Sequence, residues 1–427
     1  MQGDIHEAAA SAWIKIGPKM KIAIVSDLHI GYERFYEDAY IQARAALEKA
    51  NELADAIIIP GDIFDRRSPT PDVLAQAINI FRDLKESIRS KARVADFIPV
   101  DGNTKSHTDM PIVAIPGTHE RTAAGRENAL QLLGLAGLLV DTSESTTILE
   151  KDGERVAIFG LGGISEERLR EKLKELSPKP VAGAFSIFMM HQSTYELLPF
   201  SSEFIHNEEL PKGFDLYVNG HIHSTVESEI HGKKFLIPGS TVLTQLKDGE
   251  QRSKGFILFD TRTEKYEFVG INSRPFFVIR LVPDLSNSTK AREQCETEIE
   301  KVVSESKVKP IIRLVLSGKL PKGTSVPDLH MGSIQRSYAE KAYLEVDMAG
   351  LVDEATDQET QNLREEKIGD IPIRQLGMDI LSAKLRENGF DKSVQVAELF
   401  GILGGDLPKE KAVKKAMELI FDSAPKN

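Results

Sequence analysis

Several apolar runs in this chain end at residue types that bind divalent cations. The runs are 22–25, 57–59, 112–115, 185–190 and 216–218, and they are rich in β-branched and aromatic residues. Short runs of this kind, bounded by polar residues, are typical of buried β-strands. In an α/β fold the carboxyl ends of such strands meet in one crevice. The pattern predicts an α/β fold with its functional site at the strand ends.

The residues that follow these runs are carboxylates and imidazoles. They stand in the segments Asp27-Leu28-His29, Gly61-Asp62, Gly117-Thr118-His119, His191-Gln192 and Gly220-His221-Ile222-His223. Each segment alone is also compatible with a capped strand end or a turn, but the whole set in this order favours a metal site. Two cations about 3.5 to 4 Å apart, bridged by one carboxylate, stabilise both the attacking and the leaving oxygen of a phosphoryl displacement. Because the donors are N and O atoms, manganese, iron or zinc is favoured.

These segments resemble the calcineurin-like metallophosphoesterases. The segments Leu28-His29-Ile30-Gly31-Tyr32, Gly61-Asp62-Ile63-Phe64-Asp65 with Pro69 after it, and Ile237-Pro238-Gly239-Ser240-Thr241 are also similar to a narrower group. That group is the meiotic recombination eleven family of archaeal double-strand-break repair nucleases, whose bacterial relative is SbcD. The motifs extend over about residues 20 to 260. The resemblance implies a two-sheet metallophosphoesterase sandwich, an α+β capping domain and a C-terminal helical segment.

The resemblance also implies a role for each residue of the site. Two divalent ions, which we expect to be Mn²⁺, would share these ligands: Asp27, His29 and His223 on the first ion, His191 and His221 on the second, and Asp62 on both. His119 would stabilise the transition state or act as a general acid near the leaving oxygen. General acid–base catalysis of that kind contributes roughly 10²- to 10⁴-fold.

The chain departs from the family pattern at two positions. Thr118 stands where the family has an asparagine that binds metal, and Asp65 stands where it often has histidine. A hydroxyl is a poorer ligand than an amide carbonyl, so we expect the second ion to be held loosely or its site to be completed by water or Asp65. A weakly active or inactive DNA-repair scaffold is therefore one alternative function.

Length, composition and charge indicate how many domains the chain has, where it works and what kind of surface it presents to DNA. A chain of 427 residues exceeds the size of a single core, so two or three domains are expected. It contains no apolar run long enough for a membrane span, and its single cysteine, Cys295, suits a reducing cytoplasm. The net charge of -11 argues against a wholly basic surface but not against a local basic strip. Loop arginines after the metal motifs are candidates for DNA contact, or are simply solvated: Arg34, Arg66, Arg67, Arg121 and Arg126.

The pattern of elements predicts five segments. They are a tail (1–19), a metallophosphoesterase domain (20–272), a capping domain (273–350), an acidic and polar linker (351–370) and a helical segment (371–427). In the first domain, a hairpin turn is predicted at 151–154. Residues 273–350 show a strand, helix, strand, helix, strand order, and they either restrict the DNA that enters the site or form a plain packing module.

Two apolar surfaces predict partners. The helical segment is too small for a core of its own, so it either folds back on the head or docks through residues such as Leu399 and Phe400. By resemblance, the docking partner is a coiled-coil SMC-like ATPase. The expected helix 72–84 has a second apolar face at Leu74 and Ile78, which predicts that another surface packs on it. The resemblance implies that this surface is the same helix, together with helix 126–138, in a second subunit of a two-fold homodimer. With the ATPase it would form a heterotetramer.

The function we expect is a metal-dependent DNA exonuclease and endonuclease of double-strand-break repair. A calcineurin-like phosphodiesterase that acts on small nucleotides is the main alternative, because the metal motifs do not separate the two. The helical segment after the linker favours break repair.

Overall fold

The computed structural model describes residues 20–87, 92–99, 110–121, 126–199, 204–247, 250 and 253–352. The chain divides into two compact units. The larger extends to Leu281 and includes Cys295–Val315 and Gly332–Asp347, and the smaller contains Val282–Gln294, Leu316–Met331 and the described residues from Met348 onward. The predicted tail, all but the start of the predicted linker, and the helical segment with Leu399 and Phe400 lie outside the described residues.

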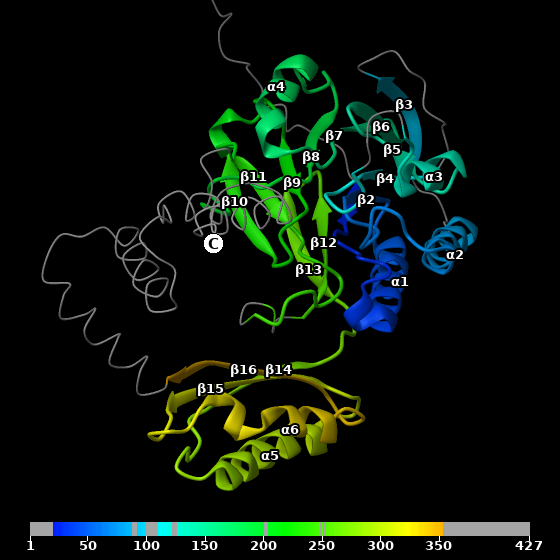
Figure 1. Cartoon of the computed structure of the whole chain (residues 1–427). Coiled ribbons are helices and arrows are strands. Elements are labelled where there is room, and N and C mark those ends of the chain that lie inside the picture. The colour runs from blue at the N-terminus through cyan, green and yellow to red at the C-terminus, as the bar shows by residue number, and fades with distance from the viewer. Residues whose placement is uncertain are drawn as a thin grey trace, which may run out of the picture. The chain divides into compact units, whose positions relative to one another are not determined.

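The first sheet has six strands in the order β13-β12-β1-β2-β4-β5 (Figure 1). Their bounds are β1 Lys21–Ile24, β2 Ala56–Pro60, β4 Ile112–Ile115, β5 Val140–Asp141, β12 Gly255–Asp260 and β13 Lys265–Gly270. Strands β1, β2, β4 and β5 run parallel, with Ile24 opposite Ile58 and Ile58 opposite Val113. This register brings the carboxyl ends of β1, β2 and β4 to one edge of the sheet.

The second sheet has seven strands in the order β10-β11-β9-β8-β7-β6-β3. Their bounds are β3 Arg93–Pro99, β6 Ser145–Lys151, β7 Glu154–Leu161, β8 Phe185–Met190, β9 Leu216–Asn219, β10 Val226–Ile230 and β11 Lys233–Ile237. Strands β7, β8, β9 and β11 are parallel neighbours. The predicted hairpin is confirmed: Asp152 and Gly153 both have positive φ, as a tight turn between β6 and β7 requires.

The two sheets pack face to face, and helices cover their outer faces. Ile22 and Ile24 of β1 contribute to a core that also contains Ile158, Ile187 and Val218 of the second sheet. The alternate residues Ala23 and Val25 face the other way, into a core with α1, α2 and α3. Leucines of α4 pack on the outer face of the second sheet. The α/β two-sheet sandwich predicted from the sequence is confirmed.

The helices of these layers have clear bounds. They are α1 Tyr36–Leu53, α2 Pro71–Ser87, α3 Ala129–Leu135 and α4 Glu166–Leu176, with short 3-10 helices at Glu33–Phe35 and Asn207–Glu209. Helix α3 is shorter than the expected 126–138. The side chain of Asn128 caps its start by accepting from the N–H of Gln131, and Gly137 follows its end with a positive φ.

The remaining elements follow the order predicted for 273–350. They are β14 Phe276–Leu281, α5 Ser288–Glu305, β15 Ile311–Lys319, the 3-10 helix Val326–Leu329, α6 Met331–Ser337 and β16 Tyr343–Val352. The strands form one sheet in the order β14-β15-β16. Among all described residues, no helix combines the length and apolar character needed to cross a membrane.

Candidate metal centre

The candidate ligands follow strands of both sheets and leave regular strand geometry at once. Asp27, His29, Asp62 and His221 all have left-handed backbone, with φ of 51°, 46°, 51° and 70°. Such conformations cost about 1 to 3 kcal/mol each for residues other than glycine, and they cluster at functional sites. The surrounding fold therefore holds these side chains in place against a local preference for ordinary backbone.

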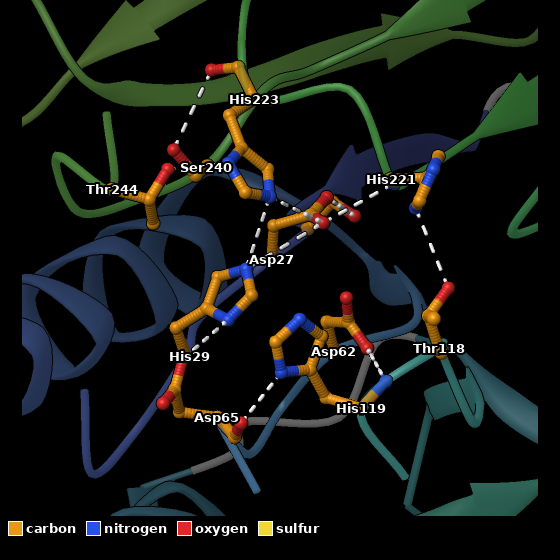
Figure 2. A network of polar contacts seen from close by, with 12 residues as sticks. Asp27, His29, Asp62, Asp65, Thr118, His119, His221, His223, Ser240 and Thr244 are labelled. Atoms are coloured by element: carbon orange, nitrogen blue, oxygen red, sulfur yellow. Dashed lines mark hydrogen bonds and ion pairs between the residues drawn. The ribbon is translucent and has the colours of Figure 1, made fainter. Parts of the chain in front are cut away.

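Asp27, His29 and His223 form one group of converging donor atoms, which we call the His29 half-site (Figure 2). The two imidazole Nε2 atoms are 3.1 Å apart, and Asp27 Oδ1 lies 3.6 Å from that of His223 and 3.9 Å from that of His29. Two ring nitrogens at this distance repel unless a proton or a cation lies between them. The donor set fits a divalent ion.

The outer nitrogens of these two histidines are already engaged. His29 Nδ1 donates to Asp65 Oδ1 at 3.2 Å, because a carboxylate can only accept. His223 Nδ1 contacts the hydroxyl of Thr244. Each ring is therefore held by one nitrogen while the other faces the shared space, as metal-binding histidines require.

Asp62 and His191 converge with Asp27 in another group of donor atoms. We call the pair Asp62 and His191 the His191 half-site. His191 is fully buried, and its Nδ1 donates to the carbonyl of Pro60 at 2.7 Å, so in the neutral ring Nε2 carries the lone pair. That Nε2 lies 3.1 Å from Asp62 Oδ2 and makes no hydrogen bond with a described residue. A buried nitrogen without a hydrogen bond is costly, and a metal ion would satisfy it.

Asp62 lies between the two half-sites. Its carboxylate is within 4.8 Å of donor atoms of Asp27 and His191, and it also belongs to a group with His29 and His119. Asp62 therefore lies close enough to donors of both half-sites to bridge two ions, which is the role that the resemblance implies.

His221 and Thr118 stand at the margin of the His191 half-site. Thr118 Oγ1 is 3.4 Å from His221 Nδ1, and the ring of His221 lies 5.2 Å from that of His191. The backbone N–H of His221 donates to Asp27 Oδ1 at 3.2 Å. The groups of converging donors found among the described residues do not include His221. Of the six ligands predicted from the sequence, the structure brings five together and places His221 beside them.

The ring of His119 is exposed at the open side of the centre. Its backbone N–H donates to Asp62 Oδ1 at 2.9 Å, and its Nδ1 donates to the carbonyl of Asp65 at 2.5 Å. The ring also contacts that of His29 edge to face, at 5.0 Å between centroids. Its Nε2 is therefore the atom free to exchange a proton with a reacting group.

Burial and neighbouring charges shift the pKa values of several groups in the centre. Burial raises the pKa of Asp27. Burial also opposes ionisation of Asp62, but the charge of His191 outweighs it and holds the pKa of Asp62 well below its usual range. Burial and the charge of His191 lower the pKa of His221 to about 4. The centre thus keeps at least one carboxylate charged and one imidazole neutral near pH 7.

The sequence patterns assign no role to two residues, Glu120 and Ser26, that support the centre through hydrogen bonds. Glu120 is fully buried, and its carboxylate accepts the N–H of Phe64 at 3.0 Å and that of Gly117 at 2.8 Å. It thereby joins the loop of Asp62 to the loop of His119. Burial, together with the charge of Asp62, raises the pKa of Glu120 to about 7. Ser26 donates to Asp27 Oδ2 at 2.5 Å.

Gly220 makes one of the close approaches in the centre that require glycine. A Cβ on Gly220 would lie 2.6 Å from His191 Nδ1 and 2.7 Å from Ser26 Oγ, which is closer than real Cβ contacts. The glycine before His221 therefore lets two ligand loops approach each other.

Several of the loop arginines proposed to contact DNA already have partners within the chain. Arg34 pairs with Glu345 at 2.7 Å and Arg66 with Glu33 at 2.6 Å. Arg121 donates to the carbonyl of Ile164 at 2.5 Å. Arg67 and Arg126 are exposed residues, as Arg66 is.

A sandwich of two sheets with carboxylates and histidines at the strand ends defines a phosphoesterase class. Residues 20–225 match the model of the calcineurin-like phosphoesterase family, so this part of the chain is similar to that family. The family is one of metal-dependent hydrolases, so the prediction of divalent metal ions is supported at that level.

The chain is also similar to individual proteins of double-strand break repair. The chain is 27% identical over 332 residues to the DNA double-strand break repair protein Mre11 of Sulfurisphaera tokodaii, covering 73% of this chain and 77% of that protein. It is 25% identical over 321 residues to the Mre11 protein of Sulfolobus acidocaldarius, covering 71% and 76%. The double-strand break repair protein MRE11 of Coprinopsis cinerea is 26% identical over 315 residues, covering 62% and 43%. The predicted resemblance to this family is confirmed.

Proposed function

We propose that this chain is a metal-dependent DNA phosphodiesterase of double-strand-break repair, with exonuclease and endonuclease activity and Mn²⁺ as its metal. The observation that carries the proposal is the position of Asp62, whose carboxylate reaches donors of both half-sites. When bound, two ions would stabilise the attacking and the leaving oxygen of an in-line displacement. The names of the relatives support DNA as the substrate.

We assign metal binding and proton transfer to separate residues of the chain. Asp27, His29 and His223 would hold the first ion, and His191 with His221 the second. Thr118, whose hydroxyl lies 3.4 Å from His221 Nδ1, would offer the second ion a further oxygen donor. His119 would give a proton to the leaving oxygen from its Nε2, because its Nδ1 is held by the carbonyl of Asp65.

An assay on several substrates tests the proposed function. We would compare hydrolysis of single-stranded DNA, a bis-aryl phosphodiester and a phosphomonoester in Mn²⁺. Cleavage of DNA supports the proposal, whereas cleavage of the small diester alone would favour the alternative enzyme on small nucleotides. No turnover on any substrate, together with retained DNA binding, would indicate the scaffold that Thr118 suggests.

The DNA contact surface remains a proposal for the loop arginines. Arg67 is an exposed candidate for phosphate contact, and Arg34, Arg66 and Arg121 would have to exchange their present partners for phosphate. Arg67→Ala should weaken DNA binding and reduce its dependence on salt. An unchanged salt dependence would remove Arg67 from the surface.

We propose a homodimer through α2 and α3. Exposed apolar side chains support this surface: Ile78 is 37%, Leu132 45% and Leu135 62% exposed. A helix that packs only on its own sheet needs no second apolar face. Sedimentation of the wild-type chain and of Leu135→Asp tests the surface. Monomers of both at tens of micromolar would contradict it.

We also propose that residues after 370 bind a coiled-coil SMC-like ATPase, giving a heterotetramer in the cytoplasm. A chain ending at Val352 should hydrolyse a simple phosphodiester normally but lose the ATPase in a pull-down. Leu399→Glu with Phe400→Glu should have the same effect, because each loses about 1.5 to 3 kcal/mol of apolar burial. Retained capture by the shortened chain would reject the assignment.

A further inference from the structure

Asp65 touches both halves of the catalytic apparatus through different atoms. Its carboxylate accepts a hydrogen bond from His29 Nδ1 at 3.2 Å, and its backbone carbonyl accepts one from His119 Nδ1 at 2.5 Å. Its own N–H donates to the carbonyl of Ile30 at 3.2 Å, which fixes the backbone between the two histidines. Figure 2 shows Asp65 below both rings.

The support that His29 receives differs from that of the other candidate ligands. Its outer nitrogen meets a carboxylate, whereas that of His191 meets the carbonyl of Pro60 and that of His223 the hydroxyl of Thr244. A charged acceptor makes a stronger hydrogen bond than a neutral one. It also makes the imidazole a better donor to a metal ion, and loss of such a partner typically costs roughly 10- to 100-fold in metal affinity.

The His191 half-site has no comparable support. Asp27 and Asp62 converge with His191, but neither contacts its outer nitrogen, which meets the neutral carbonyl of Pro60. The other described groups beside it are the neutral hydroxyl of Thr118 and the imidazole of His221, which lies outside the converging donors. The two sites are thus built with unequal strength.

We propose that Asp65 is a positioning residue that makes the His29 half-site the tighter of the two metal sites, while its carbonyl orients His119. The inference rests on the proposed function, because it assumes a centre that holds two ions. It assigns the carboxylate an effect on metal affinity and the backbone an effect on proton transfer, so a substitution of the side chain separates the two.

Titration of the full chain with Mn²⁺ by calorimetry tests the proposal. The wild type should bind two ions with different affinities. Asp65→Asn should weaken the tighter site about 10-fold, and Asp65→Ala up to about 100-fold, while the weaker site keeps its affinity. At saturating Mn²⁺ both variants should regain the wild-type turnover of a bis-aryl phosphodiester, because the carbonyl that orients His119 remains.

A matched control exists outside the centre. Glu196 accepts a hydrogen bond from His206 Nδ1 at 3.0 Å, so Glu196→Gln removes an equivalent charge from an imidazole that binds no metal. It should leave both Mn²⁺ affinities unchanged. Equal weakening of both sites in Asp65→Asn, or an isotherm identical to that of the wild type, would overturn the proposal.

Nitrogen NMR of the metal-free wild type gives a readout that does not depend on the folding of any variant. The imidazole of His29 should carry its proton on Nδ1, and a proton on Nε2 alone would overturn the proposal. Failure of the proposed function would look different: the Asp65 variants would still change the tighter affinity, but no form of the chain would cut DNA.

Discussion

The two half-sites differ in the groups that contact their ligands. A carboxylate and hydroxyl groups contact the ligands of the His29 half-site, whereas Nδ1 of His191 and Nδ1 of the neighbouring His221 are contacted by neutral groups that lie up to 3.4 Å away. Asp65 and Thr244 hold the outer nitrogens of His29 and His223, and Ser26 donates to Asp27. On the other side, His191 is fixed by the carbonyl of Pro60, but His221 is held near Thr118 by a long contact of 3.4 Å. Two sites that share Asp62 can therefore differ in affinity because of their surroundings.

Removal of the shared carboxylate should have the largest effect. Asp62→Asn is expected to lower Mn²⁺ affinity at both half-sites by more than about 100-fold, since loss of an outer-shell partner alone costs roughly 10- to 100-fold. Calorimetry and phosphodiester turnover measure this. Loss of one ion only, with the other retained at wild-type affinity, would contradict the bridging role.

His119→Ala should separate chemistry from metal binding. The ring contacts no ion in the proposed arrangement, so both Mn²⁺ affinities should remain within a few-fold of the wild type. Turnover should fall by about 10²- to 10⁴-fold, which is the usual contribution of a general acid. If the substitution instead releases an ion, His119 is a ligand, as its proximity to His29 and Asp62 would then explain.

The metal-free protein should lose stability as the pH rises. Burial alone lowers the pKa of His191, but the charge of Asp62 raises it to about 9, above the value of about 6.5 in the unfolded chain. The stability that this pair contributes is present below pH 6.5 and is lost as the pH rises through 9. A shift from 6.5 to about 9 corresponds to a loss on the order of 3 kcal/mol. Urea unfolding in chelator measures it, and His191→Asn, which lacks the titrating ring, should show a smaller pH dependence.

Thr118→Asn should have the smallest effect and should act on the His191 half-site alone. An amide oxygen is a better ligand than a hydroxyl, so the weaker ion should bind more tightly, by about 10-fold at most, and turnover should rise only when Mn²⁺ is limiting. Titration of both ions measures this. If neither affinity changes, water already completes the shell, and Thr118 does not weaken the enzyme.

The sequence patterns gave a correct account of the sandwich because buried strands have a simple period. Ile22, Ile24, Ala23 and Val25 divide between two cores by alternation alone, and the hairpin at Asp152 and Gly153 follows from turn chemistry. The extent of α3 was missed, since its ends depend on the side chains of Asn128 and Gln131 rather than on apolar spacing.

The site residues could be proposed from sequence because each follows an apolar run, and a sheet places such positions at one edge. The hydrogen bonds that support these residues could not be proposed from the sequence. Glu120 acts through the N–H groups of Phe64 and Gly117, and Asp65 acts through His29 and His119, which are contacts that no local pattern encodes.

The sequence by itself therefore determined the layers of the fold and the chemical types of the candidate ligands, because periodicity and composition are local properties. Only the tertiary structure decided which ring nitrogens face the centre, that Asp62 lies between the two half-sites, and that His221 stands at their margin. The left-handed backbone at Asp27, His29, Asp62 and His221 is the physical reason. Local preferences disfavour that conformation, and only packing of the whole sandwich holds it.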